Sequence, residues 1–185
     1  MTATDTRLSD LASMTPFATT SATPSATTTA TTSMPTSTAV SPSPYEGLSS
    51  EGLPADLHLD EPVTDATHAE FVQLLAAAVA ADDEGFLAAF DAWIDHTRYH
   101  FQQEEQWMEA MAFGPRGCHA GEHQQVLAIA EAIRTAVADD GRLDLGRRLA
   151  GELSGWFDHH VKSMDAMMVS HMKANGFSLV EGPPA

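Results

Sequence analysis

The chain has 185 residues, of which 26 are acidic and 9 are basic, so its formal net charge is −17. Lysine and arginine form no cluster, which argues against a nucleic-acid partner because nucleic acids bind basic surfaces. No run of about 18 uncharged apolar residues occurs, so we predict that no segment spans a membrane. The single cysteine, Cys118, excludes a disulfide within the chain. Its position beside His119 would allow a metal or redox role, but we expect it to pack in the interior.

The N-terminal part, residues 1–55, differs in composition from the rest of the chain. From Thr19 to Pro44 all but two residues are Ser, Thr, Ala or Pro, and this stretch carries no charge. It has too little apolar area to offset the entropy of ordering it, so we predict a disordered extension. The N-terminus also lacks the apolar core of a secretory signal, and we therefore expect a cytoplasmic protein.

Residues 56–180 have the length of one domain with its own core. Apolar residues recur there at steps of three and four, which predicts four helices with one buried face each. The segments run from Thr64 or Asp65 to about Ala81, from Asp82 to Gly114, from about Cys118 to Ala138, and from about Leu143 to Asn175. The connections are short and nothing alternates with period two. We therefore predict an all-α, up-down-up-down four-helix bundle.

Each predicted helix has a face that should point at the bundle axis. These faces comprise His68, Phe71, Val72, Leu75 and Val79 in the first helix; Phe86, Phe90, Trp93, His100, Glu104 and Met108 in the second; His119, His123, Val126, Leu127, Ala130 and Ile133 in the third; and Leu149, Leu153, Trp156, His160, Met164, Met167 and His171 in the fourth. Histidines on such faces point at each other rather than at water. Five of them together require a common partner.

Some of these polar residues have the spacing of metal ligands. His119 and His123 are four residues apart, so they lie one turn apart on the same side of a helix and can hold one ion together. His100 and Glu104 have the same spacing, although a charge pair on a solvated face would share it. His160 and Asp165 fit less well, because five residues turn an ideal helix by about 500° and leave them about 140° apart. Spacing alone does not join this last pair.

The sequence around these residues resembles a known family. His100-Phe-Gln-Gln-Glu-Glu-Gln-Trp-Met108 and Trp156-Phe-Asp-His-His-Val-Lys-Ser-Met-Asp165 resemble the hemerythrin and bacteriohemerythrin patterns HFxxEExxM and WxxxHIxxxD, with Val161 in place of the frequent isoleucine. Thr64-Asp-Ala-Thr-His-Ala-Glu-Phe71 is similar to the family's first-helix motif. The resemblance covers about residues 56–176 and fills all seven ligand positions of the family in order.

The resemblance implies a di-iron centre with an oxo or hydroxo bridge. One iron would be bound by three histidines and the other by two, and two carboxylates would bridge them; imidazole suits iron as a ligand. The second iron would keep an open position for O2. The implied ligands are His119, His123 and His160 for the first iron, His68 and His100 for the second, and Glu104 and Asp165 for both.

The resemblance also implies a function. We expect Phe71, Trp156, Phe157 and Val161 to line an apolar pocket in which O2 binds reversibly, so the protein would be a non-enzymatic carrier, store or sensor of oxygen. The alternative is a di-iron oxidase, a peroxidase or a nitric-oxide-handling protein that uses the same site. The two Glu-x-x-His repeats of ferritin-like oxidases are absent from the sequence, which favours reversible binding. The sequence indicates no protein partner.

Overall fold

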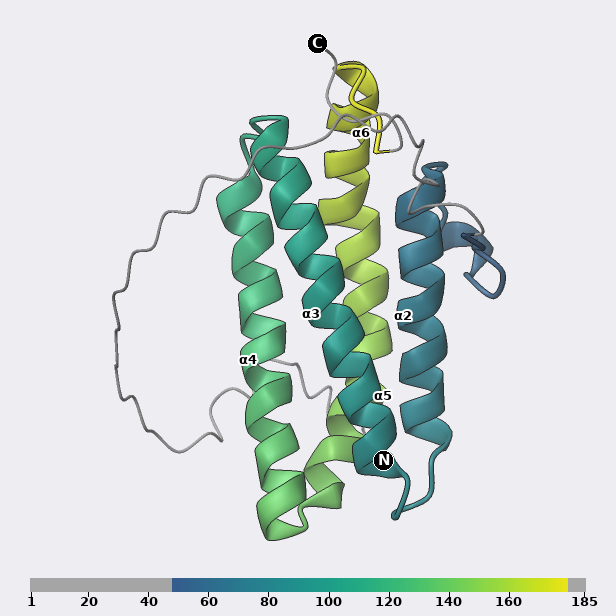
Figure 1. The fold of residues 1–185 in the computed structure, drawn as a ribbon, viewed down its shortest axis with the longest axis vertical. Helices are drawn as coiled ribbons and strands as arrows, with labels where there is room; N and C mark the ends of the chain where they lie inside the picture. Colours follow the sequence, from purple (N-terminus) through teal and green to yellow (C-terminus); the bar gives the residue numbers. More distant parts are fainter. Residues whose placement is uncertain (1–47, 180–185) are drawn as a thin grey trace, which may run out of the picture.

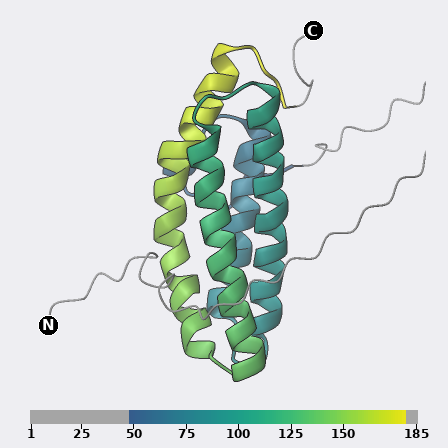
Figure 2. The same cartoon turned by 90° about the vertical axis from the view of Figure 1, so that its left-hand side faces the viewer.

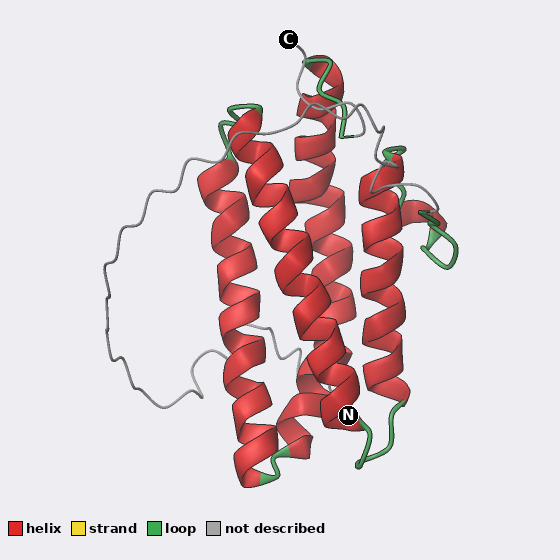
Figure 3. Ribbon diagram, viewed as in Figure 1, coloured by secondary structure: helices red, strands yellow, loops and turns green. Residues whose placement is uncertain are grey.

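In the computed structural model, which describes residues 48–179, four long helices run along a common axis (Figure 1). The described residues form helices and loops, without a strand (Figure 3), which confirms the predicted all-α fold. The last long helix continues through a π-helical turn into a shorter helix. In chain order the elements are η1 (Ala55–Leu57), α2 (Pro62–Ala80), α3 (Phe86–Ala110), α4 (Arg116–Asp140), α5 (Leu143–His160), the π-helical turn η2 (Val161–Asp165) and α6 (Ala166–Ala174).

The long helices form a closed ring around one core. Helix α2 packs against α3 and α5, and α4 packs against the same two helices, so neighbours in the chain are also neighbours in space. The view turned by 90° shows the helices still aligned along the long axis (Figure 2). The short connections, 81–85, 111–115 and 141–142, force each helix to run back along the previous one. This is the predicted four-helix bundle, and its core faces converge on the axis.

Two helices begin at positions other than the predicted ones. Helix α2 begins at Pro62, because the side chain of Glu61 caps it by accepting a hydrogen bond from Thr64 N at 2.7 Å. Helix α3 begins only at Phe86, because Asp82 closes a turn by accepting from Gly85 N at 2.8 Å. Helix α4 ends at Asp140, two residues beyond the predicted Ala138, and Gly141 follows it with φ 67°, a left-handed conformation that glycine adopts without strain.

The core face of the last helix is shifted by one residue from the prediction. We expected Met164, Met167 and His171 on this face, but Met167 is 48% exposed. Asp165, Met168 and Met172, each one position later, are fully or almost fully buried. The π-helical turn η2 accommodates one residue more than an α-helical turn, so every later residue is displaced by one position around the helix.

Two further expectations about burial were wrong. Val79 is 53% exposed, because Ala78 takes the core position in the last turn of α2, and Val79 instead lines a surface groove of about 340 Å³ between α2 and α5. Cys118 is exposed rather than packed in the interior. It precedes His119 by one residue and therefore lies about 100° around α4 from the inward face.

The packed part of the molecule begins before residue 56. Leu53 and Leu57 are buried in the main core. Two polar contacts attach the same segment to the bundle: Gln73 Nε2 donates to Glu51 O at 2.9 Å, and Lys162 Nζ pairs with Asp56 at 2.6 Å. The predicted disorder of the extension otherwise lies outside the described residues. In the part of the chain that is described, no helix has both the length and the apolarity to cross a membrane.

Candidate metal centre

The structure brings all seven predicted ligands together inside the bundle. Each of them has at most 2% of its surface exposed. Every long helix contributes, so the site exists only when the bundle is formed. The contributions are His68 from α2, His100 and Glu104 from α3, His119 and His123 from α4, His160 from α5 and Asp165 from η2.

The ligand atoms form two groups that share a carboxylate. Within each group the candidate donor atoms lie within 4.8 Å of one another. Glu104 belongs to both groups. The larger group contains Glu104, His119, His123, His160 and Asp165, and the smaller one contains His68, His100 and Glu104.

Glu104 presents one carboxylate oxygen to each group. Its Oε1 lies 2.9 Å from His100 Nε2, and its Oε2 lies 3.3 Å from His119 Nε2 and 3.4 Å from His123 Nε2. A carboxylate in this orientation can bind two cations at once, one with each oxygen.

Asp165 divides its oxygens in the same way. Its Oδ1 lies 3.0 Å from His119 Nε2 and 3.3 Å from His160 Nε2, and its Oδ2 lies 3.3 Å from His68 Nε2. The two carboxylates therefore lie between three imidazoles on one side and two on the other.

The π-helical turn explains how His160 and Asp165 come to the same site. In such a turn the backbone N–H bonds to the carbonyl five residues earlier, so residues five apart lie about one turn apart. The turn η2 covers Val161–Asp165 and follows His160 directly. It removes the angular mismatch that an α-helix would impose.

The buried polar atoms of the cluster fit a cation. Both oxygens of Asp165, Oε2 of Glu104 and both nitrogens of His68 are buried without a hydrogen-bond partner within the described residues. Buried polar atoms normally have such a partner, and burial without one is costly. The Nε2 atoms of His119 and His123 also lie 3.1 and 3.0 Å from that of His160, as ligand atoms around one ion do.

The charges of the cluster are strongly coupled. Burial disfavours the ionised carboxyls of Glu104 and Asp165, but the surrounding imidazoles outweigh it and hold the pKa of both groups well below its usual range. Burial likewise opposes protonation of His68 and His119, yet the nearby carboxylates of Asp165 and Glu104 raise the pKa of each to about 9. Burial lowers the pKa of His123 to about 3. The carboxylates thus attract positive charge, whether protons or cations.

The predicted pocket residues lie on both sides of the cluster. On the two-histidine side, the ring of Phe157 contacts His68 edge-on at 5.2 Å and stacks on Phe71 at 3.9 Å. On the three-histidine side, half-buried Trp156 stacks on His160 at 4.7 Å. Val161 is fully buried in the same core.

Sequence reasoning missed two residues that contact the ligands. Phe101 stacks on His123 with the ring centroids 3.8 Å apart. The carboxylate of Glu122 lies 2.8 Å from Nδ1 of His160. Only the position of Glu122, three residues after His119 and hence close to the inward face, could have indicated it.

His96, one turn before His100, lies outside the ligand groups. Its Nδ1 is 3.5 Å from the exposed carboxylate of Glu70, and its ring is 5.9 Å from that of His100. It therefore lies beside a candidate ligand without belonging to the cluster.

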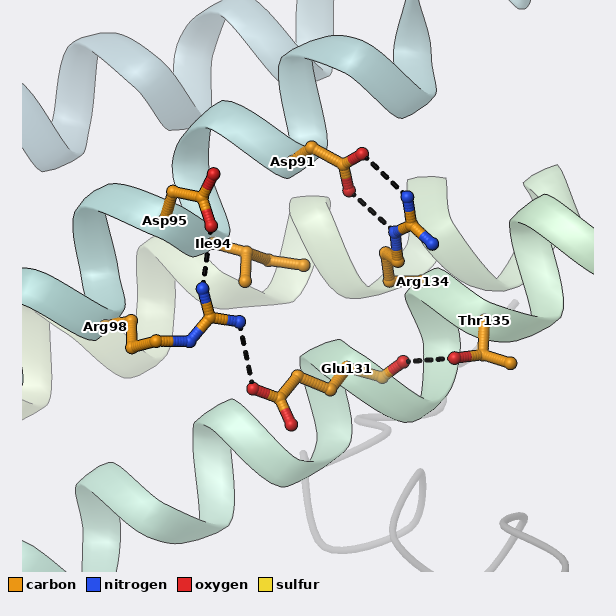
Figure 4. A pocket seen from close by; sticks show the side chains of 7 residues that line it. All are labelled: Asp91, Ile94, Asp95, Arg98, Glu131, Arg134 and Thr135. Carbon is orange, nitrogen blue, oxygen red and sulfur yellow. Dashed lines mark hydrogen bonds and ion pairs between the residues drawn. The ribbon is translucent and has the colours of Figure 1, made fainter.

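A polar groove between α3 and α4 is a different kind of feature (Figure 4). Arg134 makes a bidentate ion pair with Asp91, and Arg98 pairs with both Asp95 and Glu131. Because these charges pair with one another, the groove ties α3 to α4 and offers no free charge to a ligand.

The molecule is thus a four-helix bundle with a buried cluster of five imidazoles and two carboxylates that could hold cations. The family model described as "Hemerythrin HHE cation binding domain" matches residues 62–171. The chain is also 47% identical over 120 residues to a protein of Ralstonia nicotianae named "Bacteriohemerythrin", a match that covers 65% of this chain and 87% of that relative. No solved structure matches the chain. The chain belongs to the hemerythrin family.

Proposed function

We propose that the protein binds two iron ions at this cluster and binds O2 reversibly at one of them, as a carrier, store or sensor of oxygen. The observation that carries the proposal is the unequal division of the imidazoles around two shared carboxylates. The name of the Ralstonia relative, Bacteriohemerythrin, supports the same function.

The two proposed iron positions, one in each ligand group, offer different numbers of protein donors. The first would have three imidazoles, Oε2 of Glu104 and Oδ1 of Asp165. The second would have two imidazoles, Oε1 of Glu104 and Oδ2 of Asp165, which is one donor fewer. Ferrous ions, when bound, supply the electrons for O2 binding and an open coordination position. The lower donor count supports an open position on the His68 and His100 side.

The apolar residues control access to that side. Phe71 and Phe157 pack against the imidazoles of His100 and His68, and both rings have at most 2% of their surface exposed. We propose that these rings, with Val161, exclude water and withhold protons from the bound gas, and that Trp156 holds His160 in place. An apolar shell of this kind favours a small uncharged ligand.

The test is iron loading followed by exposure to O2. Anaerobic loading should give two irons per chain, O2 should produce a visible absorption band, and vacuum should restore the starting spectrum. Glu104→Gln should lose at least one iron, because a bridging oxygen and a charge are removed. Glu109→Gln, on the same helix but 74% exposed and paired with Arg116, should load like the unmodified protein.

Other outcomes would contradict the proposal. One iron per chain, or zinc in preference to iron, would contradict the di-iron site. Steady consumption of O2 in the presence of a reductant, or turnover of peroxide or nitric oxide, would establish the enzymatic alternative with the same metals.

A further inference from the structure

We propose that Glu122 is a positioning residue that acts on the metal site through His160. By accepting a hydrogen bond from Nδ1–H, its carboxylate fixes the ring with Nε2 directed at the cation, and it strengthens cation binding at the three-histidine position. This inference rests on the proposed binding of two iron ions.

The geometry places His160 between a carboxylate and the cluster. The Oε2 atom of Glu122 is 2.8 Å from Nδ1 of His160. The other nitrogen of the ring, Nε2, lies 3.0 Å from His123 Nε2 and 3.3 Å from Asp165 Oδ1. A neutral imidazole carries its proton on one nitrogen only. When Nδ1 donates to Glu122, the lone pair is therefore on Nε2, the atom that faces the cluster.

The side chain of Glu122 also bridges two helices. It lies on α4 between two ligands of that helix, about 60° around the helix from His119. His160 lies at the end of the neighbouring helix α5 with 1% of its side chain exposed, whereas Glu122 is 33% exposed. A buried ring thus donates to a carboxylate that still contacts solvent.

This hydrogen bond distinguishes His160 from the other ligand imidazoles. Within residues 48–179, Nδ1 is buried without a hydrogen-bond partner in the remaining four, which are His68, His100, His119 and His123. A carboxylate on the outer nitrogen of a metal-bound histidine makes that histidine a stronger donor. Only one of the two ions would gain from Glu122, and we infer that the three-histidine position binds its ion more tightly for this reason.

An ordinary ion pair between α4 and α5 would have the same distance, so the test must separate orientation and charge from packing. Glu122→Gln keeps the shape and an accepting oxygen but removes the charge, and Glu122→Ala removes both. Glu131→Gln is the matched control, because Glu131 lies on the same helix and pairs across to α3 through Arg98 at 3.1 Å.

The first measurement is stepwise anaerobic titration with ferrous ion against a competing chelator. Glu122→Ala should weaken the tighter binding step by about tenfold or more, the usual effect of removing such a partner. Glu122→Gln should weaken it less, and Glu131→Gln should not change it. The affinity of the weaker binding step should be nearly the same in the unmodified protein and in the three variants.

The second measurement is the midpoint potential of the iron-loaded protein. A nearby negative charge stabilises the ferric state, so Glu122→Gln should raise the potential although the fold is unchanged by circular dichroism. If both Glu122 variants keep the affinities and the potential of the unmodified protein, the inference is overturned. If Glu122→Ala does not fold, Glu122→Gln decides alone. An unmodified protein that fails to take up two irons would overturn the proposed function as well.

Discussion

At the scale of single residues, two side chains determine how the cluster is divided. Glu104 and Asp165 each direct one oxygen at the three-histidine group and the other at the two-histidine group. Their ionised forms are favoured by the imidazoles around them, which holds the pKa of each carboxyl low. Without these two residues the five imidazoles would have no common counter-charge, and two nearby cations would repel each other.

A glycine shows how closely the helices approach each other. A Cβ added at Gly146 of α5 would lie 2.5 Å from the ring of Phe86, a fully buried residue at the start of α3, and 2.9 Å from Val137. We predict that Gly146→Ala lowers the free energy of unfolding by about 1–3 kcal/mol, because overpacking costs more than the gain in helix propensity. Urea unfolding, monitored by circular dichroism, measures this change in the free energy of unfolding.

The control for this substitution lies on the same helix. Gly151 has open space where a Cβ would be added. Gly151→Ala should therefore stabilise the protein by about 0.5–1 kcal/mol, the difference in helix propensity alone. If both alanine variants are stabilised, the close contact between α5 and α3 is not as tight as described.

Among the helical elements, the π-helical turn η2 connects two packed regions and the candidate metal site. It turns Asp165 toward His160, and it displaces the core face of α6 so that Met168 and Met172 are buried. These two methionines pack with Met108 and Phe113 in a smaller core at the end of the bundle. A single extra residue in one turn thus sets both the last ligand and the packing that follows it.

We predict that deletion of Ser163 preserves the site. It would leave His160 and Asp165 four positions apart, and an α-helix places residues with that spacing on one face. The segment from η2 into α6 should become α-helical, with α6 still packed and two irons still bound, as measured by metal analysis and circular dichroism.

Deletion of Ser154, an exposed residue in the regular part of α5, is the comparison. It should turn His160 and Asp165 about 100° away from the cluster, and iron binding should be lost. If deletion of Ser163 also abolishes iron binding, the π-helical turn contributes more than the angular position of Asp165.

At the scale of the whole molecule, the bundle is completed by a segment that precedes the first long helix. Leu53 and Leu57 lie in the main core, although only the three-residue turn η1 gives this segment regular structure. Lys173 Nζ of α6 donates to Leu59 O at 2.8 Å, and Leu59 N donates to Asp65 of α2 at 2.8 Å, so Leu59 ties the end of the segment to both helices. The segment therefore belongs to the folded unit.

Two truncations should separate the segment from the extension before it. Removing residues 1–47, which are too poor in apolar residues to add to a core, should leave unfolding and iron content unchanged. Removing residues 1–57 also removes two buried leucines and should lower the free energy of unfolding by roughly 3–6 kcal/mol. Urea unfolding and metal analysis of both chains measure this. Loss of stability or iron in the shorter truncation would show that the extension contributes to the fold.

The four helices and the seven candidate ligands could be predicted from the amino-acid sequence alone. Helices with one buried face repeat their apolar residues at steps of three and four, and that pattern is local, so it can be read without knowing the partners. The pairs His100 with Glu104 and His119 with His123 follow from the same local geometry. The seven residues were then grouped by their resemblance to the hemerythrin family.

How the candidate ligands meet depends on contacts between helices that are far apart in the chain. The π-helical turn has no periodic signal, so the sequence left Asp165 about 140° from His160 and placed Met167 in the core, where the structure has Met168 instead. Glu122 could not be assigned to His160 either, because their contact joins α4 to α5 across 38 positions of the chain. Such contacts depend on the distance and rotation between packed helices, which local periodicity does not specify.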